Sequence, residues 1–300
     1  MELTIQALSK TYPNGTQALS DVNLVIPQGM FGLLGPNGAG KSTLMRTIAT
    51  LQEADSGSIR LGDLDVLRQK DEVRRTLGYL PQEFGLYPKV SAIDLLDHFA
   101  LLKGVIARGE RKELVRQLLW QTNLWDARHS KLGGFSGGMR QRFGIAVALI
   151  GNPKLLIVDE PTAGLDPAER VRFLNLLGEI GENSIVILST HIVDDVSELC
   201  SRMAIIDKGR IVLEGEPLAV VRPLEGRVWR KLIEKSELAA HSSEHRVITT
   251  RLLGGRVIVR VLADSDPGGG FAPAEPDLED AYFAAIRMAA DAGVPLARAG

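Results

Sequence analysis

A glycine-rich segment near the N-terminus has the residue types and the spacing of a phosphate-binding loop. Residues 35–42 match the pattern G-x-x-x-x-G-K-[ST] in full. In such a loop, backbone N–H groups wrap the phosphates, and the following helix adds the positive end of its dipole. Lys41 is expected to reach the β- and γ-phosphates, and the Ser42 hydroxyl is placed for Mg²⁺. The loop predicts these nucleotide-binding residues: Gly35, Pro36, Asn37, Gly38, Ala39, Gly40, Lys41, Ser42 and Thr43.

Two adjacent carboxylates are the second candidate for phosphate chemistry. Residues 155–158 are Leu-Leu-Ile-Val, which predicts a buried strand, and Asp159 and Glu160 follow it directly. Ligands of open α/β sheets collect at the carboxyl ends of the strands. We therefore expect Asp159 to hold Mg²⁺ through water and Glu160 to orient or deprotonate the attacking water. An acidic pair at a strand end could also only solvate a loop, but the presence of the phosphate-binding loop favours the catalytic interpretation.

The order of elements around these residues predicts a parallel α/β domain. An apolar run at residues 30–34 precedes the loop and a helical stretch at 41–51 follows it, which is the beginning of a parallel α/β unit. The other elements expected up to residue 220 are strands at 3–8, 22–26, 155–158 and 185–188, helical segments between 90 and 123, and a hairpin at 204–213.

The character of the sequence changes after about residue 220. Residues 247–262 alternate on both sides of a Gly-Gly pair, which predicts a hairpin, and residues 264–276 are rich in Gly and Pro, which is typical of a linker. A terminal helix is expected at residues 277–290. Because no internal repeat is present, we predict one nucleotide-binding domain at 1–220 and a small α+β accessory region at 221–300.

The composition limits the kinds of partner that the protein can have. Cys200 is the only cysteine, so no intrachain disulfide is possible, and its setting predicts a helical, buried position. The net charge of −2 and the lack of a Lys/Arg block argue against a nucleic-acid partner. The N-terminus lacks a secretory signal, and no apolar run approaches the ~18–20 residues of a membrane span. If the protein serves a membrane, we expect it to act from the cytosol through a partner.

A third segment resembles a known family. Residues 135–142, Phe-Ser-Gly-Gly-Met-Arg-Gln-Arg, resemble the signature motif of ABC ATPases and lie upstream of the strand that carries the two carboxylates. The resemblance continues in order along about residues 2–220. It implies an α/β fold with a P-loop NTPase (RecA-like) core, an antiparallel β subdomain, and a helical signature subdomain at about residues 90–150.

The resemblance also assigns roles to residues that carry little information by themselves. It implies that Tyr12 stacks on adenine, that Gln82 joins Mg²⁺ and senses a transmembrane partner, and that His191 contacts the γ-phosphate. Without the family, Tyr12 could be a turn aromatic and His191 a hydrogen-bonded strand-end histidine. The residues that the resemblance places at an interface with a second subunit are Ser136, Gly137 and Gly138, which face its ATP, and Ala163, Gly164, Leu165 and Asp166, which cross the interface.

The signature motif departs from the commonest family sequence, Leu-Ser-Gly-Gly-Gln, at both ends. Phe135 and Met139 stand where the family has Leu and Gln, and Met139 cannot make the hydrogen bonds of an amide. This puts a fine contact or a coupling step in question, while ATP binding is expected to be unaffected. Such a motif is similar to those of the branch that exports drugs, lipids or polysaccharides. Residues 278–283 also resemble the Leu-Glu-Asp-Ala-aromatic segment that ends many ATPases of the drug-exporter branch, although an amphipathic terminal helix would explain them equally.

The resemblance implies a head-to-tail dimer, expected to be a homodimer, in which each ATP with its Mg²⁺ lies between the phosphate-binding loop of one subunit and residues 136–138 of the other. The transport pathway would belong to a separate permease, which would hold this cytoplasmic subunit at the inner face of the cell membrane. Residues 84–88, Phe-Gly-Leu-Tyr-Pro, are a candidate docking surface for that permease, and a buried loop is the alternative. Two other classes stay open: a soluble ABC ATPase acting on ribosomes or DNA, and an importer subunit.

Overall fold

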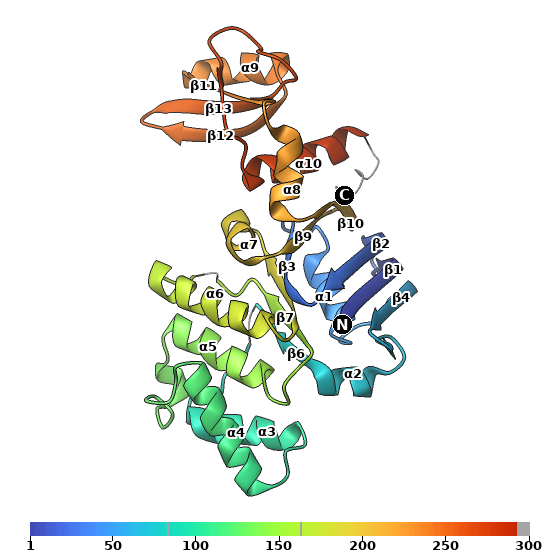
Figure 1. Cartoon of the computed structure of the whole chain (residues 1–300), viewed down its shortest axis with the longest axis vertical. Coiled ribbons are helices and arrows are strands. Elements are labelled where there is room, and N and C mark those ends of the chain that lie inside the picture. The colour runs from blue at the N-terminus through green and yellow to red at the C-terminus, as the bar shows by residue number, and fades with distance from the viewer. Residues whose placement is uncertain (83, 163, 293–300) are drawn as a thin grey trace.

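The computed structural model describes residues 1–82, 84–162 and 164–292, which form three β-sheets (Figure 1). The largest sheet has the strand order β10-β9-β3-β8-β7-β6, and its neighbouring strands are parallel except for the β9–β10 pair. Strands β7 and β8 are buried at every position, as expected for parallel strands covered on both faces. This sheet confirms the predicted α/β class and contains the predicted strands, together with β6, which was not predicted. Their bounds are β3 (Gly29–Leu34), β6 (Leu77–Leu80), β7 (Leu155–Asp159), β8 (Ile185–Thr190), β9 (Arg202–Asp207) and β10 (Arg210–Gly215).

The phosphate-binding loop connects the central strand β3 to helix α1 (Lys41–Ile48). Gly40 takes a left-handed φ of 109° directly before the helix. The sequence predicts that this helix continues to residue 51, but it ends at Ile48. Thr50 has a φ of 60°, which an α-helix does not allow. The expected strand, loop and helix are therefore present, with a shorter helix.

An antiparallel sheet with the order β2-β1-β4-β5 lies beside the main sheet (Figure 1). Its buried residues share one apolar core with Leu44 and Met45 of α1 and with Leu155 of β7, so that α1 is packed between the two sheets. The predicted strands at 3–8 and 22–26 lie inside its first two strands. The elements of this part are β1 (Glu2–Thr11), β2 (Gln17–Pro27), β4 (Ser56–Leu61), β5 (Leu64–Asp65) and the short helix α2 (Lys70–Thr76).

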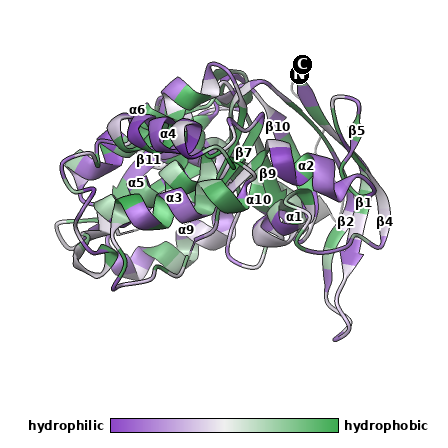
Figure 2. Cartoon of the chain, turned by 90° about the horizontal axis from the view of Figure 1, so that it is seen from below, coloured by the Kyte–Doolittle hydropathy of each residue, from purple (hydrophilic) through white to green (hydrophobic). Residues whose placement is uncertain are grey.

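A cluster of helices lies at the opposite end of the main sheet from the C-terminal region (Figure 1). The helical stretch predicted between 90 and 123 is divided into two helices, because Gly104 takes a φ of 93° after the first one. Most residues of α4 are hydrophilic, as the colouring of Figure 2 shows. The helices of this cluster are α3 (Ala92–Leu102), α4 (Arg108–Gln121), α5 (Gly137–Ala148) and α6 (Pro167–Gly181), whereas α7 (Val193–Leu199) lies at the end of the sheet next to the C-terminal region. Cys200 is buried directly after α7 rather than within it.

The C-terminal region forms a third sheet with the order β12-β13-β11-β14. The prediction of a plain linker at 264–276 is wrong for part of that segment. Residues 272–273 pair with β11 as the edge strand β14, and Phe271 is buried against Ile233 and Val259, because an aromatic ring gains more from this apolar cluster than from solvent. The elements here are α8 (Pro217–Val221), β11 (Val228–Ile233), α9 (Leu238–Glu244), β12 (Val247–Leu253), β13 (Arg256–Leu262), β14 (Ala272–Pro273) and α10 (Leu278–Ala292).

The terminal helix α10 lies between this third sheet and the main sheet (Figure 1). It contacts α7, α8, β9, β10 and β12, and its residues Leu278 and Tyr282 are buried in the same core as Val196 of α7. Residues 293–300 of the predicted accessory region lie outside the described part of the chain. Within the described part, no helix has both the length and the apolar character that crossing a membrane requires.

Candidate nucleotide-binding site

A cavity of about 650 Å³ lies along the phosphate-binding loop. The predicted residues that line it come from four separate segments: Tyr12, the loop residues 36–43, Gln82 and Glu160. The volume is within the usual range of small-molecule sites. The fold thus brings most of the predicted nucleotide-binding residues of one subunit to one place.

Glycines of the loop are required where it passes close to other backbone segments. A Cβ atom at Gly40 would lie 2.5 Å from the carbonyl oxygen of Ala18, and one at Gly35 would lie 2.4 Å from that of Ile206. Gly38 has a φ of 79°, a conformation that residues with a side chain rarely adopt. The loop is therefore held close to the backbone of the β2 and β9 segments.

The Lys41 side chain folds back against the beginning of the loop. Its Nζ atom donates to the carbonyl oxygens of Gly35 at 2.6 Å and Pro36 at 3.2 Å, and it is 3.9 Å from a carboxylate oxygen of Glu160. Burial lowers the pKa of Lys41, while the charges of Glu160 and Asp159 act in the opposite direction. The ammonium group thus occupies the place where phosphates are expected and can exchange carbonyl partners for phosphate oxygens.

The two carboxylates have different surroundings although they are adjacent in sequence. Asp159 is 5% exposed, and burial raises the pKa of its carboxyl group, with a further increase from Glu160. The hydroxyls of Ser189 and Ser42 and the charge of Lys41 oppose this increase in pKa. Hydroxyl and carboxylate oxygens are the ligands that Mg²⁺ prefers, so Ser42 and Asp159 together fit that ion.

Glu160 is turned away from the strand direction by a φ of 46°. Its Oε2 atom lies 3.1 Å from Nδ1 of His191, whose side chain is 55% exposed, and its backbone N–H donates to Ser189. A carboxylate and an imidazole in contact at the end of a buried sheet can together orient a water molecule and accept its proton. The structure therefore brings His191, predicted only through the resemblance, next to Glu160.

Tyr12 lies at the edge of the cavity, in the turn between β1 and β2. Its hydroxyl is 3.2 Å from Thr43 Oγ1 and donates to Gln52 Oε1 at 3.2 Å. These contacts hold the Tyr12 ring against α1 and the residues that follow it. The ring therefore has a fixed position at the cavity edge, where it could stack on adenine. Gln82 is exposed at another edge of the cavity, after β6.

The signature motif is not among the residues that line the cavity. Ser136 caps α5, and its Oγ accepts from the N–H of Met139 at 3.2 Å, while Asp166 caps α6 and accepts from Glu169 at 2.9 Å. Ser136, Gly137 and Asp166 are exposed. Arg142 of α5 pairs with Glu169 of α6 at 3.0 Å, which joins the two capped helices. Ala163 lies outside the described residues.

Four further residues line the cavity without having been predicted: Thr16, Gln17, Ala18 and Lys208. Thr16 lies in the β1–β2 turn after Tyr12, and Gln17 and Ala18 begin β2, so proximity to Tyr12 in sequence is the only signal for these three. Lys208 lies in the β9–β10 turn with a φ of 46° and reaches the site through the tertiary fold, because the N–H of Gly209 donates to the carbonyl of Ala39. No local pattern could have placed Lys208 there.

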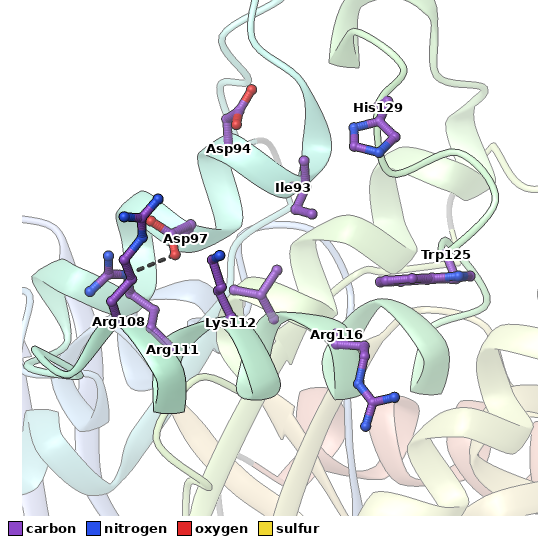
Figure 3. Close-up of a pocket in the computed structure, with 10 residues that line it drawn as sticks. Ile93, Asp94, Asp97, Arg108, Arg111, Lys112, Arg116, Trp125 and His129 are labelled. Atoms are coloured by element: carbon purple, nitrogen blue, oxygen red, sulfur yellow. Dashed lines mark hydrogen bonds and ion pairs between the residues drawn. The ribbon is translucent and has the colours of Figure 1, made fainter.

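A separate cavity of about 550 Å³ lies between α3 and α4 in the helical subdomain (Figure 3). Its basic residues come from α4, and Arg111 Nε donates to Asp97 of α3 at 2.7 Å. At the other end of the cavity, the guanidinium of Arg128 lies over the Trp125 ring, 4.3 Å from the ring centroid, in a cation–π contact. None of the predicted nucleotide-binding residues lines this cavity, so it is distinct from the phosphate site.

Comparison with known proteins identifies the family of the chain. The sequence model of the family described as "ABC transporter" matches residues 19–163. The daunorubicin/doxorubicin resistance ATP-binding protein DrrA of Streptomyces peucetius is 35% identical over 262 residues, which are 87% of this chain and 77% of that protein. The probable multidrug ABC transporter ATP-binding protein YbhF of Escherichia coli is 34% identical over 246 residues, or 78% of this chain and 42% of that protein.

A solved structure is also similar. The ATP-binding cassette MJ0796, in a dimeric post-hydrolysis state bound to ADP and Pi, has 27% sequence identity and a TM-score of 0.65, covering 71% of this chain and 98% of that one. The class that the fold and the site define is a P-loop ATPase. The chain belongs to the ABC transporter family, in which it is an ATP-binding and ATP-hydrolysing subunit. The predictions of family, fold class, enzymatic activity and bound ATP are confirmed.

Proposed function

We propose that this subunit binds ATP with Mg²⁺, pairs head-to-tail with a second copy of itself, and drives export through a separate membrane permease. The observation that carries the proposal is that the site is half complete. One cavity holds the phosphate-binding loop and Glu160, whereas the exposed residues Ser136 and Gly137 lie outside it. A second copy can supply these residues across an interface, as in a dimeric cassette.

Within one subunit, the described contacts support a division of roles. Lys41 neutralises the β- and γ-phosphates, and Ser42, Asp159 and Gln82 would hold Mg²⁺ with their oxygen atoms. When bound, the ion neutralises charge on the phosphate oxygens. Glu160, in contact with His191, orients the attacking water and accepts its proton. Positioning and charge neutralisation carry most of the rate in phosphoryl transfer.

From the second subunit, the N-terminus of α5 would meet the γ-phosphate. Ser136, Gly137 and Gly138 stand at the positive end of that helix, which favours an anion. Met139, which replaces the family's usual Gln, is half-buried and packs against the main core. Its side chain is therefore engaged within its own subunit, which supports an intact phosphate contact through the three preceding residues.

Export and the membrane location are supported by the names of the relatives and by one segment of the terminal helix. DrrA is named for drug resistance and YbhF for multidrug transport, and the segment 278–283, which resembles the end of exporter ATPases, lies in the buried helix α10. We infer that the subunit is cytoplasmic and is held at the inner face of the membrane by its permease.

For the permease contact, we infer a docking surface beside β6. Tyr87 is 62% exposed, while its neighbours Phe84 and Leu86 pack against the main core and fix the segment. A short apolar helix of the permease is the occupant that suits this surface.

The substitution Glu160→Gln tests the ATPase assignment. The amide keeps the shape of the side chain but cannot accept a proton, so the variant is expected to bind ATP and to accumulate as an ATP-bound dimer on size-exclusion chromatography. Glu182→Gln, at an exposed position outside the site, is the matched control and should turn over normally. If Glu160→Gln hydrolyses ATP at the wild-type rate, Glu160 does not activate the attacking water.

The substitution Tyr87→Ser tests the docking surface. In the transporter reconstituted with its permease, it should lower transport per ATP hydrolysed, while ATPase activity of the isolated subunit stays at the wild-type level. Leu252→Ser removes an equally exposed apolar side chain from β12 and is the control, since Leu252 is 69% exposed and lies in the C-terminal sheet. Unchanged coupling in Tyr87→Ser would contradict the proposed surface.

A further inference from the structure

We propose that Asp195 is a positioning residue that ties together the three segments carrying Glu160, His191 and Asp166. This inference rests on the function proposed above and goes beyond it. Asp195 lies in the first turn of α7 and is 0% exposed. A carboxylate so completely removed from water must be paired with positive charge and hydrogen-bond donors. Its partners therefore show what it holds in place.

Both oxygens of Asp195 are engaged. Oδ1 accepts from Arg170 Nε at 2.7 Å and lies 2.6 Å from Nη2 of the same guanidinium. Oδ2 accepts from the hydroxyl of Thr162 at 2.8 Å and lies 3.5 Å from the hydroxyl of Thr190. Thr162 and Thr190 are buried, at 4% and 1% exposure. In this junction, Asp195 and the two threonines are buried, while the Arg170 side chain is 30% exposed, and none of the four residues lines the nucleotide cavity.

Each partner of Asp195 comes from a segment that also contributes a site residue. Thr162 follows β7 two positions after Glu160, and Thr190 is the last residue of β8, directly before His191. Arg170 lies in the first turns of α6, four positions after its capping residue Asp166. One carboxylate thus contacts the water-activating segment, the histidine segment and the helix that begins at the predicted dimer interface.

The junction is stiffened by bonds around it. The N–H of Ile192 donates to Thr190 Oγ1 at 2.9 Å, and the N–H of Glu160 donates to the carbonyl of Ser189 at 2.8 Å. The contact of Glu160 with His191 therefore depends on two neighbouring chain segments keeping their spacing. A second subunit that presses on the Asp166 segment would act on this spacing through Arg170 and Asp195.

The substitution Asp195→Asn tests the inference by removing the charge while keeping the shape. We expect kcat to fall by about 10- to 100-fold with the KM for ATP within about twofold, because ATP is still bound and only the groups around the attacked phosphate lose their alignment. The matched control is Asp280→Asn, which removes a carboxylate of 1% exposure from its Arg260 partner in the C-terminal region. Asp280→Asn should lose stability similarly and keep its kcat, with both variants assayed well below their melting temperatures.

A second pair of variants keeps the test valid if Asp195→Asn does not fold. Thr162→Val removes one hydroxyl from the junction without changing its volume, and Thr162→Ser restores that hydroxyl. Thr162→Val should lower kcat several-fold, and Thr162→Ser should recover it. A kcat for Asp195→Asn within about twofold of wild type, or equal losses in Thr162→Val and Thr162→Ser, would overturn the inference. Failure of the proposed function is distinguishable, because Glu160→Gln would then keep its ATPase activity.

Discussion

The substitution Lys41→Met removes the only charge of the phosphate-binding loop and keeps most of the length of the side chain. The Lys41 side chain is 6% exposed, and its ammonium group donates to the carbonyls of Gly35 and Pro36. Burial also lowers the pKa of Lys41, which shows that its charge is costly in this position. We expect the nucleotide-free variant to stay folded with nearly the wild-type melting temperature, because a costly charge and its two hydrogen bonds are lost together.

Binding of ATP should be affected much more strongly than folding. Hydrogen bonds to charged groups contribute about 1.5–3 kcal/mol each, and the two carbonyl bonds that Lys41 gives up offset part of what it gains from the phosphates. A net loss of about 2–3 kcal/mol corresponds to a Kd that is about 30- to 150-fold weaker. At an ATP concentration 100-fold above the wild-type Kd, the wild type gains about 2.7 kcal/mol of stability from the ligand, and the variant should gain less than about 1 kcal/mol.

Titration with a fluorescent ATP analogue and thermal melts with and without ATP would measure both quantities. Lys103→Met is the matched control, because Lys103 also has a pKa lowered by burial and donates to two carbonyls, those of Arg74 at 3.1 Å and Leu77 at 3.0 Å. Lys103→Met should bind ATP normally. If Lys41→Met binds ATP within threefold of wild type, Lys41 does not hold the phosphates and the reasoning from the loop is refuted.

Two other substitutions in the site give expectations of opposite kinds. Because burial raises the pKa of Asp159, the folded state binds this proton more tightly than the unfolded chain, and the charged carboxylate lowers stability as the pH rises through that raised pKa. Asp159→Asn should therefore melt higher than wild type at neutral pH in EDTA yet lose Mg²⁺-dependent ATPase activity, and an unchanged or lower melting temperature would contradict the pKa shift. Tyr12→Phe should lose the hydroxyl contacts to Thr43 and Gln52 but keep its ATP affinity. Tyr12→Ala should weaken ATP binding by about 1–3 kcal/mol if the ring stacks on adenine. Measuring the Kd of both variants for ATP tests this expectation.

The parts of the fold that the sequence predicted are those with short-range causes. The apolar strand at 155–158, its two carboxylates and the glycine loop each follow from neighbouring residues, because burial, strand ends and backbone turns are local properties. The helix at 41–51 was predicted too long, since nothing in the sequence marked the left-handed φ of Thr50. The Gly and Pro content of residues 264–276 predicts a linker and hides a single apolar anchor, Phe271.

The parts that could not be predicted depend on contacts between distant segments. Lys208 reaches the cavity only because the β9–β10 turn packs under the loop. Nothing in the local sequence marked Asp195 as buried. An acidic residue at the beginning of a helix is ordinarily exposed to solvent, where it interacts favourably with the helix dipole. Its burial and its three partners follow from the parallel order of β7 and β8 and from the packing of α6 and α7 on them.

The packing of α7 gives the C-terminal region a physical connection to the site. Val196, directly after Asp195, lies so close to β3 that a Cβ atom at Gly32 would be 2.5 Å from it, and β3 leads into the phosphate-binding loop. On its other side α7 contacts α10, whose Leu278 and Tyr282 share the core with Val196. The helix that holds Asp195 is thus fixed between the nucleotide-binding sheet and the accessory region. One helix, α7, thus packs against α10 on one side and carries Asp195 of the junction behind Glu160 and His191.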